Sequence, residues 1–563
     1  MRLLRLIISS LFVLLFIIGF TPNSSAQTNE RPLIMPASGI PSASTWLLGQ
    51  PYGNTLGAYN FGQAWYSAGQ GLHFGIDLPM PCQTELVAVA DGEVGFVDNL
   101  NFGAGPHNLI LRHPTLGITT LYGHLYEAPN LVQGQIVTQG QVIALSGDPD
   151  VTCDSRPHLH FEVRSLDYRT AYNPVAYIDV NWHMLASIGG YSYPLFQQNI
   201  DNSRQWMSLE NQPNVSFGGF RLNDYQAVWP LAFDLLPPPN PPLNRELEPL
   251  ADDLNWNFRQ IGYDNCCWRR WWHPSDPDKL YVIDGVNGQR AGIFEWSAQS
   301  GSMTALITTA PPAIESPDGT HQVFNNGTTV TIRNLVDEGE YTVNTQGVTP
   351  GLNINNTQLV WVTRENTTLP GQAQPNSTIW ISNVDGSDPR EIISGQGLSA
   401  SWLDNDRLLI RIAGEGRLTT LSVYDVRDAS AFQIGTWQNI RSLSVAPNGG
   451  RLMFYVTRQG NPADDGVYVV DTSANAVAQR LSWFGAWRWR DADSVYYLPF
   501  VPENSNHSLA YYDIPSGENR ILLTPSDLQF TVMNGDWDVS ADGRRIVFQN
   551  ALDQNMWLLE IVE

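Results

Sequence analysis

The sequence predicts an all-β protein with two domains, and three observations support this fold class. The 563 residues, 42% hydrophobic and 15% charged, are too many for one core and too apolar for a disordered chain. The 47 glycines, 37 prolines and 11% aromatic residues favour many short strands joined by turns over a bundle of helices. A turn motif also recurs at a regular interval in the C-terminal half.

A secretory signal is the first element that we expect along the chain. Two arginines lie within the first five residues, an apolar stretch runs from Leu6 to Phe20, and small residues lead up to Ala26. This layout predicts a signal peptide over residues 1–26 and a mature protein outside the cytoplasm, secreted or in the cell envelope. The apolar stretch is shorter than the ~20 residues that span a bilayer, although an uncleaved membrane anchor is the alternative. No later segment is apolar enough to cross, so we expect no transmembrane segment in the mature chain.

The charge of the chain argues against nucleic acid as a partner. Lys+Arg number 31 and Asp+Glu 55, which gives a formal net charge of -24, and Lys279 is the only lysine. An electrostatic grip on phosphates would therefore have to come from a local basic patch, and we expect no nucleic-acid partner.

Three regions follow the signal. Residues 28–185 hold most of the histidines and a dense run of short strand patterns. Residues 186–250 have little periodicity and include a proline-rich stretch over 237–242, which predicts a stiff linker. The recurring turn motif fills residues 251–563, which we expect to form the second domain.

The recurring motif places an apolar residue six positions after an Asp or Asn. Asp-Gly or Asn-Gly supplies the positive φ of a tight turn, and we expect the alternating apolar residues that follow to form the inner strand of a blade. Seven anchors stand at intervals of roughly 37 to 51 residues, mean about 44, which is the period of a four-stranded propeller blade. The strong pairs are Asp318 with Phe324, Asn448 with Phe454 and Asp542 with Phe548, and the weaker ones are Asp276 with Val282, Asn355 with Trp361, Asp404 with Ile410 and Asp491 with Tyr497.

These turns resemble those of TolB-like and WD-type β-propellers. The likeness is carried by Ser316-Pro317-Asp318-Gly319, Ala446-Pro447-Asn448-Gly449 and Ser540-Ala541-Asp542-Gly543. It implies a C-terminal β-propeller, with seven blades as the best count, that serves targeting or protein binding. A pair of irregular β-sandwiches is the alternative.

Cysteine usage agrees with export. Cys82 follows Asp77 by five residues and Cys153 precedes His158 by five, so a bridge between them would draw two site-bearing segments together. In an oxidising compartment a closed loop of that length contributes about 3 to 5 kcal/mol. We favour this bridge over two free thiols, and we leave open whether the adjacent pair at 266–267 forms a disulfide or packs.

Four histidines fall in motifs that suit a metal site. His73 and Asp77 lie four residues apart, and His158 and His160 lie two apart, so on a strand both rings of the second pair face one side. Catalytic zinc takes three imidazole or carboxylate ligands and leaves a fourth position for water. His73, Asp77 and one of the last pair would supply that set. The other histidine of the pair is then free for proton transfer, and His124 is a further candidate.

In combination, these motifs resemble the lysostaphin and LytM type of zinc metallopeptidases, which cut peptide bonds in bacterial cell walls. The likeness runs from His73 to Glu162 through Leu121-Tyr122-Gly123-His124-Leu125 and Pro157-His158-Leu159-His160-Phe161-Glu162. It implies an open, largely antiparallel β-sheet over residues 28–185 and a bound Zn²⁺. The implied zinc ligands are His73, Asp77 and His160, and the implied catalytic pair is His124 and His158.

One residue departs from the family pattern. A small residue or glycine commonly precedes the Pro-His-Leu-His run, whereas this chain has Arg156 there. The shape of the cleft rim, and with it the choice of substrate, is therefore open.

Taken together, the sequence predicts a secreted zinc metalloendopeptidase that hydrolyses peptide cross-links of peptidoglycan, with a propeller for targeting or for binding an envelope protein. Two alternatives remain: a catalytically silent activator of a partner cell-wall hydrolase, or an envelope binding or scaffold protein led by its propeller.

Overall fold

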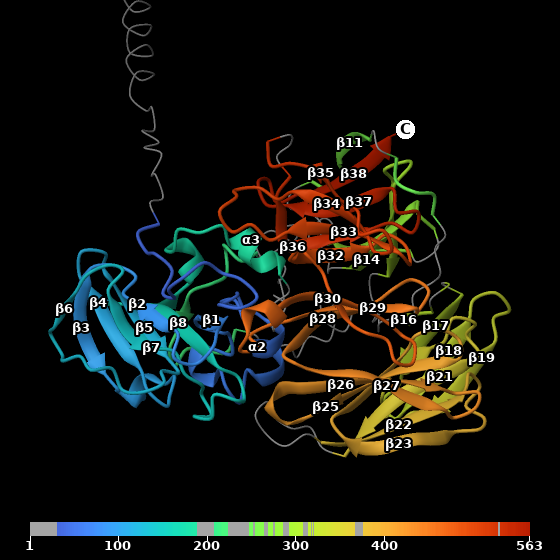
Figure 1. The fold of residues 1–563 in the computed structure, drawn as a ribbon, viewed down its shortest axis with the longest axis horizontal. Helices are drawn as coiled ribbons and strands as arrows, with labels where there is room; N and C mark the ends of the chain where they lie inside the picture. The colour runs from blue at the N-terminus through green and yellow to red at the C-terminus, as the bar shows by residue number, and fades with distance from the viewer. Residues whose placement is uncertain are drawn as a thin grey trace, which may run out of the picture.

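The structure is a computed structural model in which two β-domains lie side by side (Figure 1). It describes residues 31–188, 208–222, 247–251, 254–263, 268–273, 276–284, 292–307, 314–316, 318, 320–365, 375–526 and 530–562. The expected signal peptide, the proline-rich stretch over 237–242 and the cysteines at 266–267 lie outside these residues.

The N-terminal domain is built on an eight-stranded antiparallel sheet. Its order is β10-β9-β8-β5-β4-β3-β6. Strand β1 lies off this path and pairs with the first residues of β8, on the side opposite β5. Strand β5 is buried at every position and β8 at all but its two ends, and the polar His160, Glu162 and Arg164 of β8 are buried because they pair with one another. The strands are β1 (Ile76–Pro79), β3 (Gly92–Val97), β4 (Leu109–His113), β5 (Ile118–Gly123), β6 (Ile136–Val137), β8 (His158–Ser165), β9 (Thr170–Tyr172) and β10 (Val215–Ser216).

A second small sheet and a few short helical turns complete this domain. The sheet pairs β2 (Glu85–Val87) with β7 (Val142–Leu145). The α-helices are α2 (Leu56–Phe61), capped by the Thr55 hydroxyl, and α3 (Trp182–Ser187), and the 3-10 turns are Ser67–Gly69, Leu100–Phe102 and Pro174–Ala176. The expected open, largely antiparallel sheet is therefore confirmed.

Part of the range that we expected to be linker belongs to this sheet. Residues 208–222 return to the N-terminal domain, where β10 pairs with β9 at its edge. The Tyr52 hydroxyl holds the returning segment by donating to the main-chain oxygen of Pro213 at 3.0 Å. A two-residue strand carries no periodic signal, so the sequence could not have placed it.

The C-terminal domain is a propeller of seven four-stranded sheets, which confirms the expected blade count. Blades one to three are β12 (Trp268–Trp272), β13 (Lys279–Asp284), β14 (Gly292–Ser297), β15 (Met303–Ile307); β16 (Ile314–Glu315), β17 (His321–Asn325), β18 (Thr329–Asn334), β19 (Glu340–Asn344); and β20 (Gly351–Leu352), β21 (Gln358–Arg364), β22 (Asn376–Asn383), β23 (Arg390–Gln396). Blades four and five are β24 (Leu398–Trp402), β25 (Arg407–Ala413), β26 (Leu418–Asp425), β27 (Ala431–Gln438); and β28 (Ile440–Val445), β29 (Arg451–Val456), β30 (Gly466–Asp471), β31 (Gln479–Arg480). Blades six and seven are β32 (Gly485–Trp489), β33 (Ser494–Pro499), β34 (Leu509–Asp513), β35 (Asn519–Leu523); and β36 (Val532–Val539), β37 (Arg545–Asn550), β38 (Met556–Val562) with β11 (Asn255–Gln260), and 3-10 turns lie at Glu415–Arg417 and Pro462–Asp464.

The last blade closes the ring by combining both ends of the domain. β11, from the start of the domain, pairs along its whole length with β38, from its end. Because the outer strand of the seventh blade comes from the opposite end of the chain, the circle cannot open without breaking that pairing.

The recurring turn leads into the second strand of each blade, not the innermost one as we expected. Phe454 lies on β29 and Phe548 on β37, each next to the strand that comes before the turn. Gly449 and Gly543 both have φ of +67°, so the Asn-Gly and Asp-Gly turns take the left-handed conformation that favours glycine. The error arose because the strand before the turn carries no repeated signal of its own.

The two domains share an apolar interface. Leu47 and Ile188 of the N-terminal domain are buried in one cluster with propeller residues that include Tyr455 and Trp483. At the edge of the interface, the Asn181 side chain donates to the main-chain oxygen of Asn504 at 2.7 Å. Figure 1 shows β1 and β8 on the side of the N-terminal domain that faces the propeller.

Among the described residues, no helix has the length and apolarity needed to cross a membrane.

The expected disulfide is present and joins the loop that follows β1 to the loop that precedes β8. Cys82, just after β1, bonds Cys153, just before β8, and the two cysteines are 71 positions apart in sequence. We predict that replacing both cysteines by serine lowers the free energy of unfolding by about 3 to 4 kcal/mol, because the unfolded chain loses a long closed loop.

Denaturant unfolding of the full chain, with and without the bridge, measures this difference. Equal midpoints for the two forms would contradict the prediction.

Candidate functional site

Strand pairing places two of the predicted site residues directly opposite one another. In the β1–β8 ladder Asp77 is the partner of His160, and Pro79 is the partner of His158. Residues two apart on a strand share a face, so the imidazoles of His158 and His160 lie on the same side of the sheet as the Asp77 carboxylate.

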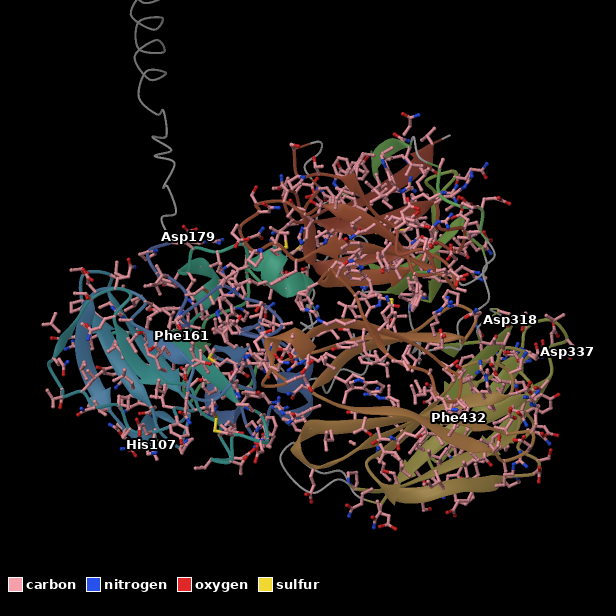
Figure 2. The ribbon with its side chains drawn as sticks, in the orientation of Figure 1. His107, Phe161, Asp179, Asp318, Asp337 and Phe432 are labelled. Carbon is pink, nitrogen blue, oxygen red and sulfur yellow. A yellow bond between two sulfur atoms is a disulfide. The ribbon has the colours of Figure 1, made fainter. Side chains whose placement is uncertain are left out.

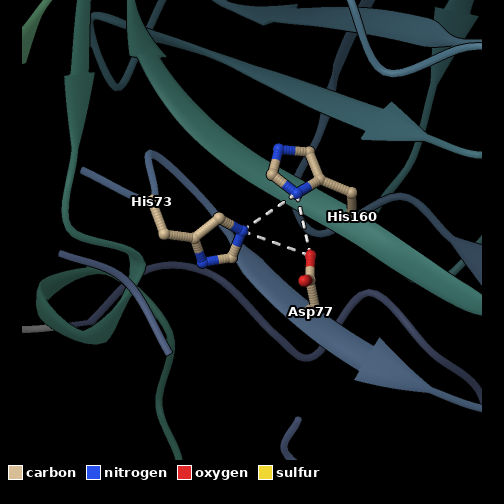
Figure 3. A group of neighbouring side chains, drawn as sticks. All are labelled: His73, Asp77 and His160. Atoms are coloured by element: carbon tan, nitrogen blue, oxygen red, sulfur yellow. Dashed lines mark hydrogen bonds and ion pairs between the residues drawn. The ribbon is translucent and has the colours of Figure 1, made fainter. Parts of the chain in front are cut away.

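His73 joins these residues from the loop before β1. Its main chain pairs with that of Gly53, and its Nε2 atom lies 3.3 Å from Asp77 Oδ1 and 3.3 Å from His160 Nδ1. Asp77 Oδ1 lies 2.9 Å from His160 Nδ1. Figure 3 shows the three groups converging from two strands and a loop. The structure therefore brings His73, Asp77 and His160 to one point.

The close approach of these groups depends on a glycine. A side chain at Gly75 would stand 2.8 Å from the His160 ring and 2.6 Å from the main-chain oxygen of Phe161. The turn between His73 and Asp77 can therefore lie against β8 only because position 75 has no side chain.

Hydrogen-bond acceptors outside the cluster fix the orientation of both rings. His73 Nδ1 lies 2.8 Å from the main-chain oxygen of Pro51, and His160 Nε2 lies 3.2 Å from Glu162 Oε1. Because these oxygens can only accept, each facing nitrogen carries the hydrogen in the neutral ring. The opposite nitrogen of each ring then presents a lone pair to the same point as Asp77. Three such groups so close together need a cation or a proton between them.

The geometry fits a metal ion. The ligand atoms of a tetrahedral zinc site stand about 3.3 Å apart, since the bonds to nitrogen and oxygen are roughly 2.0 to 2.2 Å long. The three separations between ligand atoms here are 2.9, 3.3 and 3.3 Å, so the three atoms are close enough together to bind one ion. These residues could hold a metal, and their nitrogen and oxygen donors suit zinc among the transition metals.

Two further histidines stand beside this cluster. The ring centroid of His124 lies 4.7 Å from that of His158 and 5.8 Å from that of His160. His158 Nδ1 donates to the main-chain oxygen of Arg156 at 2.6 Å, and His124 Nδ1 donates to that of Gly105. The Nε2 atom of each ring is therefore left as a proton acceptor, and that of His158 lies 3.7 Å from Asp77.

Burial and charge set the protonation of the cluster. Burial lowers the pKa of His124 well below its usual value, and the rings of His158 and His160 lower it further. Burial also lowers the pKa of His158, with Asp77 opposing the effect. Both rings are therefore neutral near pH 7 and can accept a proton.

The other members of the cluster are shifted in the opposite sense. Burial would raise the pKa of Asp77, but the surrounding imidazoles, led by that of His73, hold it well below its usual value. Burial would lower the pKa of His160, but the carboxylates of Asp77 and Glu162 outweigh it and raise the pKa to about 9. In the absence of a bound cation, a proton on His160 offsets the negative charge at this point.

Sequence reasoning missed the ion pair behind His160. Glu162 is fully buried and accepts from Arg164 Nε at 2.5 Å and from Arg164 Nη2 at 2.9 Å. Burial would raise the pKa of Glu162, but Arg164 and then His160 hold it below its usual range. The available signal was the spacing: both residues follow His160 at two-residue steps on β8 and so share its face.

The cluster opens into a cavity of about 1060 Å³ that lies between the two domains. The N-terminal domain contributes the five candidate residues and the Arg156 rim, and the propeller contributes Gln396 and residues 413–419 and 439–442. Nothing in the sequence indicated the propeller wall, because the docking of two domains leaves no local pattern.

Other residues that drew attention in the sequence lie apart from this cavity or at its rim. The Tyr122 hydroxyl is fully buried and donates to the main-chain oxygen of Val87, which fits a packing role. Arg156 lies at the rim, where it pairs with Asp150 at 3.2 Å and stands over Trp65. His107 lies at the outer edge of the N-terminal domain, away from the propeller (Figure 2).

Comparison with known sequences assigns a family to part of the chain. Residues 71–174 match Peptidase family M23. The uncharacterized lipoprotein YgeR of Escherichia coli (strain K12) is 32% identical over 164 residues, which cover 28% of this chain and 61% of that protein. The glycyl-glycine endopeptidase ALE-1 of Staphylococcus capitis is 26% identical over 190 residues, or 33% of this chain and 49% of that protein. The matched regions span less than two thirds of these relatives.

A solved structure is similar to the C-terminal part of the fold. TolB from Acinetobacter baumannii gives a TM-score of 0.27 at 15% identity and covers 51% of this chain and 78% of that chain. The seven closed sheets described above establish the propeller. The expected combination of a peptidase domain similar to lysostaphin with a seven-bladed propeller is confirmed.

We predict that Glu162→Gln weakens binding of a transition-metal ion about 10- to 100-fold, because His160 loses the carboxylate that orients its ring and raises its basicity. Competition with a chromophoric chelator measures the affinity. Glu127→Gln is the matched control, because Glu127 is exposed and stands outside the cavity lining.

Loss of folding is checked by comparing melting curves, with Glu162→Gln/Arg164→Gln as a second variant that leaves no unpaired buried arginine. A folded Glu162→Gln protein that binds metal as tightly as the unaltered chain would refute the assigned role of Glu162.

Proposed function

We propose that this chain, whose residues 71–174 form a Peptidase family M23 domain, is a zinc metalloendopeptidase that hydrolyses peptide cross-links of bacterial peptidoglycan. The observation that carries the proposal is the meeting of His73 Nε2, Asp77 Oδ1 and His160 Nδ1 within 3.3 Å of one another. The name of the related endopeptidase ALE-1 supports peptide bonds as the target.

In this proposal His73, Asp77 and His160 hold the zinc ion. When bound there, zinc supplies a Lewis acid for the scissile carbonyl and lowers the pKa of a water molecule towards neutrality. The Pro51 carbonyl and the Glu162 carboxylate keep the two rings turned towards the ion. The cavity beside this point has room for an extended peptide.

His158 and His124 handle the proton. Each ring is neutral and presents Nε2 as an acceptor, because its Nδ1 hydrogen is held by a main-chain oxygen. His158, the nearer of these two rings to Asp77, takes the proton from the attacking water and returns it to the leaving amine. Once it holds this proton, His158 is a donor at the same Nε2 atom, and the neutral ring of His124, with its centroid 4.7 Å away, orients the attacking water by accepting a hydrogen bond at Nε2.

We further propose that the protein works outside the cytoplasm after removal of residues 1–26. The Cys82–Cys153 bridge supports this location, because such bonds persist in oxidising compartments. On this view residues 28–185 with the returning segment form the peptidase domain, and residues 251–563 form a propeller that binds the cell envelope or a protein there.

The hydrolysis is tested with purified cell walls. We predict that His158→Ala lowers the rate of release of free amino groups by at least about 100-fold while one zinc per chain is retained, because the proton acceptor is lost and the ligands are not. His73→Ala should lose both the zinc and the activity. Colorimetric amine assays and elemental analysis of the same samples provide the two readouts.

His107→Ala is the matched control, since His107 pairs with Asp98 and stands outside the cavity lining. It should leave both zinc content and activity unchanged. A zinc-loaded chain that releases no amines from any cell wall, or a His158→Ala variant with undiminished activity, would overturn the proposed reaction. The first result would favour the silent activator.

A further inference from the structure

The propeller forms one wall of the cavity that holds the candidate metal site. Its contribution comes from three successive blades: the end of β23, the loop between β25 and β26 with the first residues of β26, and the beginning of β28. On the opposite side of the same cavity stand His158 and the Arg156 rim. A molecule that reaches His158 through this cavity therefore also contacts the propeller.

This wall is held in place by several contacts. Arg417 donates to the main-chain oxygen of Ser155, on the rim of the peptidase domain. The main-chain nitrogen of Asn439 donates to the Arg417 oxygen at 3.1 Å, and the Gln438 side chain donates to that of Gly416 at 2.9 Å. The loop is thus tied both to the next blade and to the other domain.

The backbone of the wall is also strained. Arg417, Asn439 and Ser442 have φ of +61°, +52° and +51°, a conformation that non-glycine residues seldom adopt. Such strain persists where the surrounding structure enforces it, and it concentrates at functional sites. Other non-glycine residues of the propeller also have positive φ, and these three are the ones that line the cavity.

The wall carries an arginine without a partner. Within the described residues, the Arg441 guanidinium takes part in no hydrogen bond and no ion pair, although the chain has 55 acidic residues to 31 basic ones. Of the acidic residues that line the cavity besides Asp77, Glu415 is exposed and Asp154 lies on the opposite rim. An arginine left unpaired in so acidic a chain, facing a cavity, is available to an anion from outside.

A second arginine beside it adds to the positive charge. Arg458 lies in the interface, where its Nη1 is 3.4 Å from the main-chain oxygen of Pro79 and its buried Nη2 has no hydrogen-bond partner. Burial, followed by repulsion from Arg441 and Arg417, lowers the pKa of Arg458 to about 9. Arg417 and Arg441, which line the cavity, and Arg458, in the interface beside them, therefore place three guanidinium groups near one another on this side.

We propose that Arg441 binds a carboxylate of the peptide substrate and so makes the propeller part of the specificity site. This inference rests on the proposed function. It narrows the substrate class to cross-linked peptides with a free carboxylate that reaches the propeller wall while the scissile bond lies at His158. Arg417 positions the wall, and the guanidinium of Arg441 donates two charge-assisted hydrogen bonds to the carboxylate. The propeller therefore contributes to the choice of substrate in addition to its proposed role in binding the cell envelope or a protein there.

The test uses a pair of synthetic cross-linked peptides that differ only in that the free carboxylates of one are amides in the other. We expect the full chain to bind the acid about 10-fold more tightly than the amide. Calorimetry on the full chain carrying His158→Ala measures binding without consumption of the peptide. With the unaltered chain, the same preference should appear in KM with little change in kcat.

Arg441→Gln should abolish the preference by weakening binding of the acid alone, and Arg441→Lys should restore part of it because the charge returns. Arg364→Gln is the matched control, since Arg364 is an exposed arginine of β21 that stands outside the cavity lining. Melting curves check that each variant is folded.

The outcomes separate this inference from the proposed function. Cleavage of both peptides with no preference, or a preference that survives Arg441→Gln, would overturn the carboxylate site and leave the hydrolase intact. Tight, Arg441-dependent binding of the acid peptide without cleavage by the unaltered chain would contradict the proposed hydrolysis and support the carboxylate site.

Discussion

The antiparallel register of β1 with β8 is the constraint on which the rest of the site depends. It sets Asp77 opposite His160 and His158 one step further along the same face. A shift of one residue would turn both imidazoles to the other side of the sheet. The Cys82–Cys153 bridge joins the loops at the ends of these two strands, so the register is held covalently as well as by hydrogen bonds.

Around this register, acceptors decide which nitrogen of each histidine faces the cavity. A main-chain oxygen fixes His73, and the Glu162 carboxylate fixes His160. The same arrangement, with main-chain oxygens of Gly105 and Arg156, leaves His124 and His158 as proton acceptors. A cluster of four histidines is therefore divided by its surroundings into two rings that can bind a metal and two that can carry a proton.

Local spacing predicted much of this organisation, and contacts between distant segments were out of its reach. The Asp and Asn anchors predicted seven blades because they recur at a regular interval, and the strongest of them carry the turn glycine, as at Gly449 and Gly543. The position of β10 and the propeller wall at Arg441 depend on where separate segments meet. Such meetings leave no period in the sequence. The motif spacing identified His73, Asp77 and His160 as candidates, and only the fold brings their lone pairs together.

The convergence of three lone pairs on one cation is tested most directly by anomalous X-ray diffraction at the zinc edge from crystals of the purified chain. We expect a single strong peak within about 2.0 to 2.2 Å of His73 Nε2, Asp77 Oδ1 and His160 Nδ1. The absence of a peak there from zinc-supplemented crystals, or a peak bound through His160 Nε2 with Glu162 displaced, would contradict the arrangement of the site.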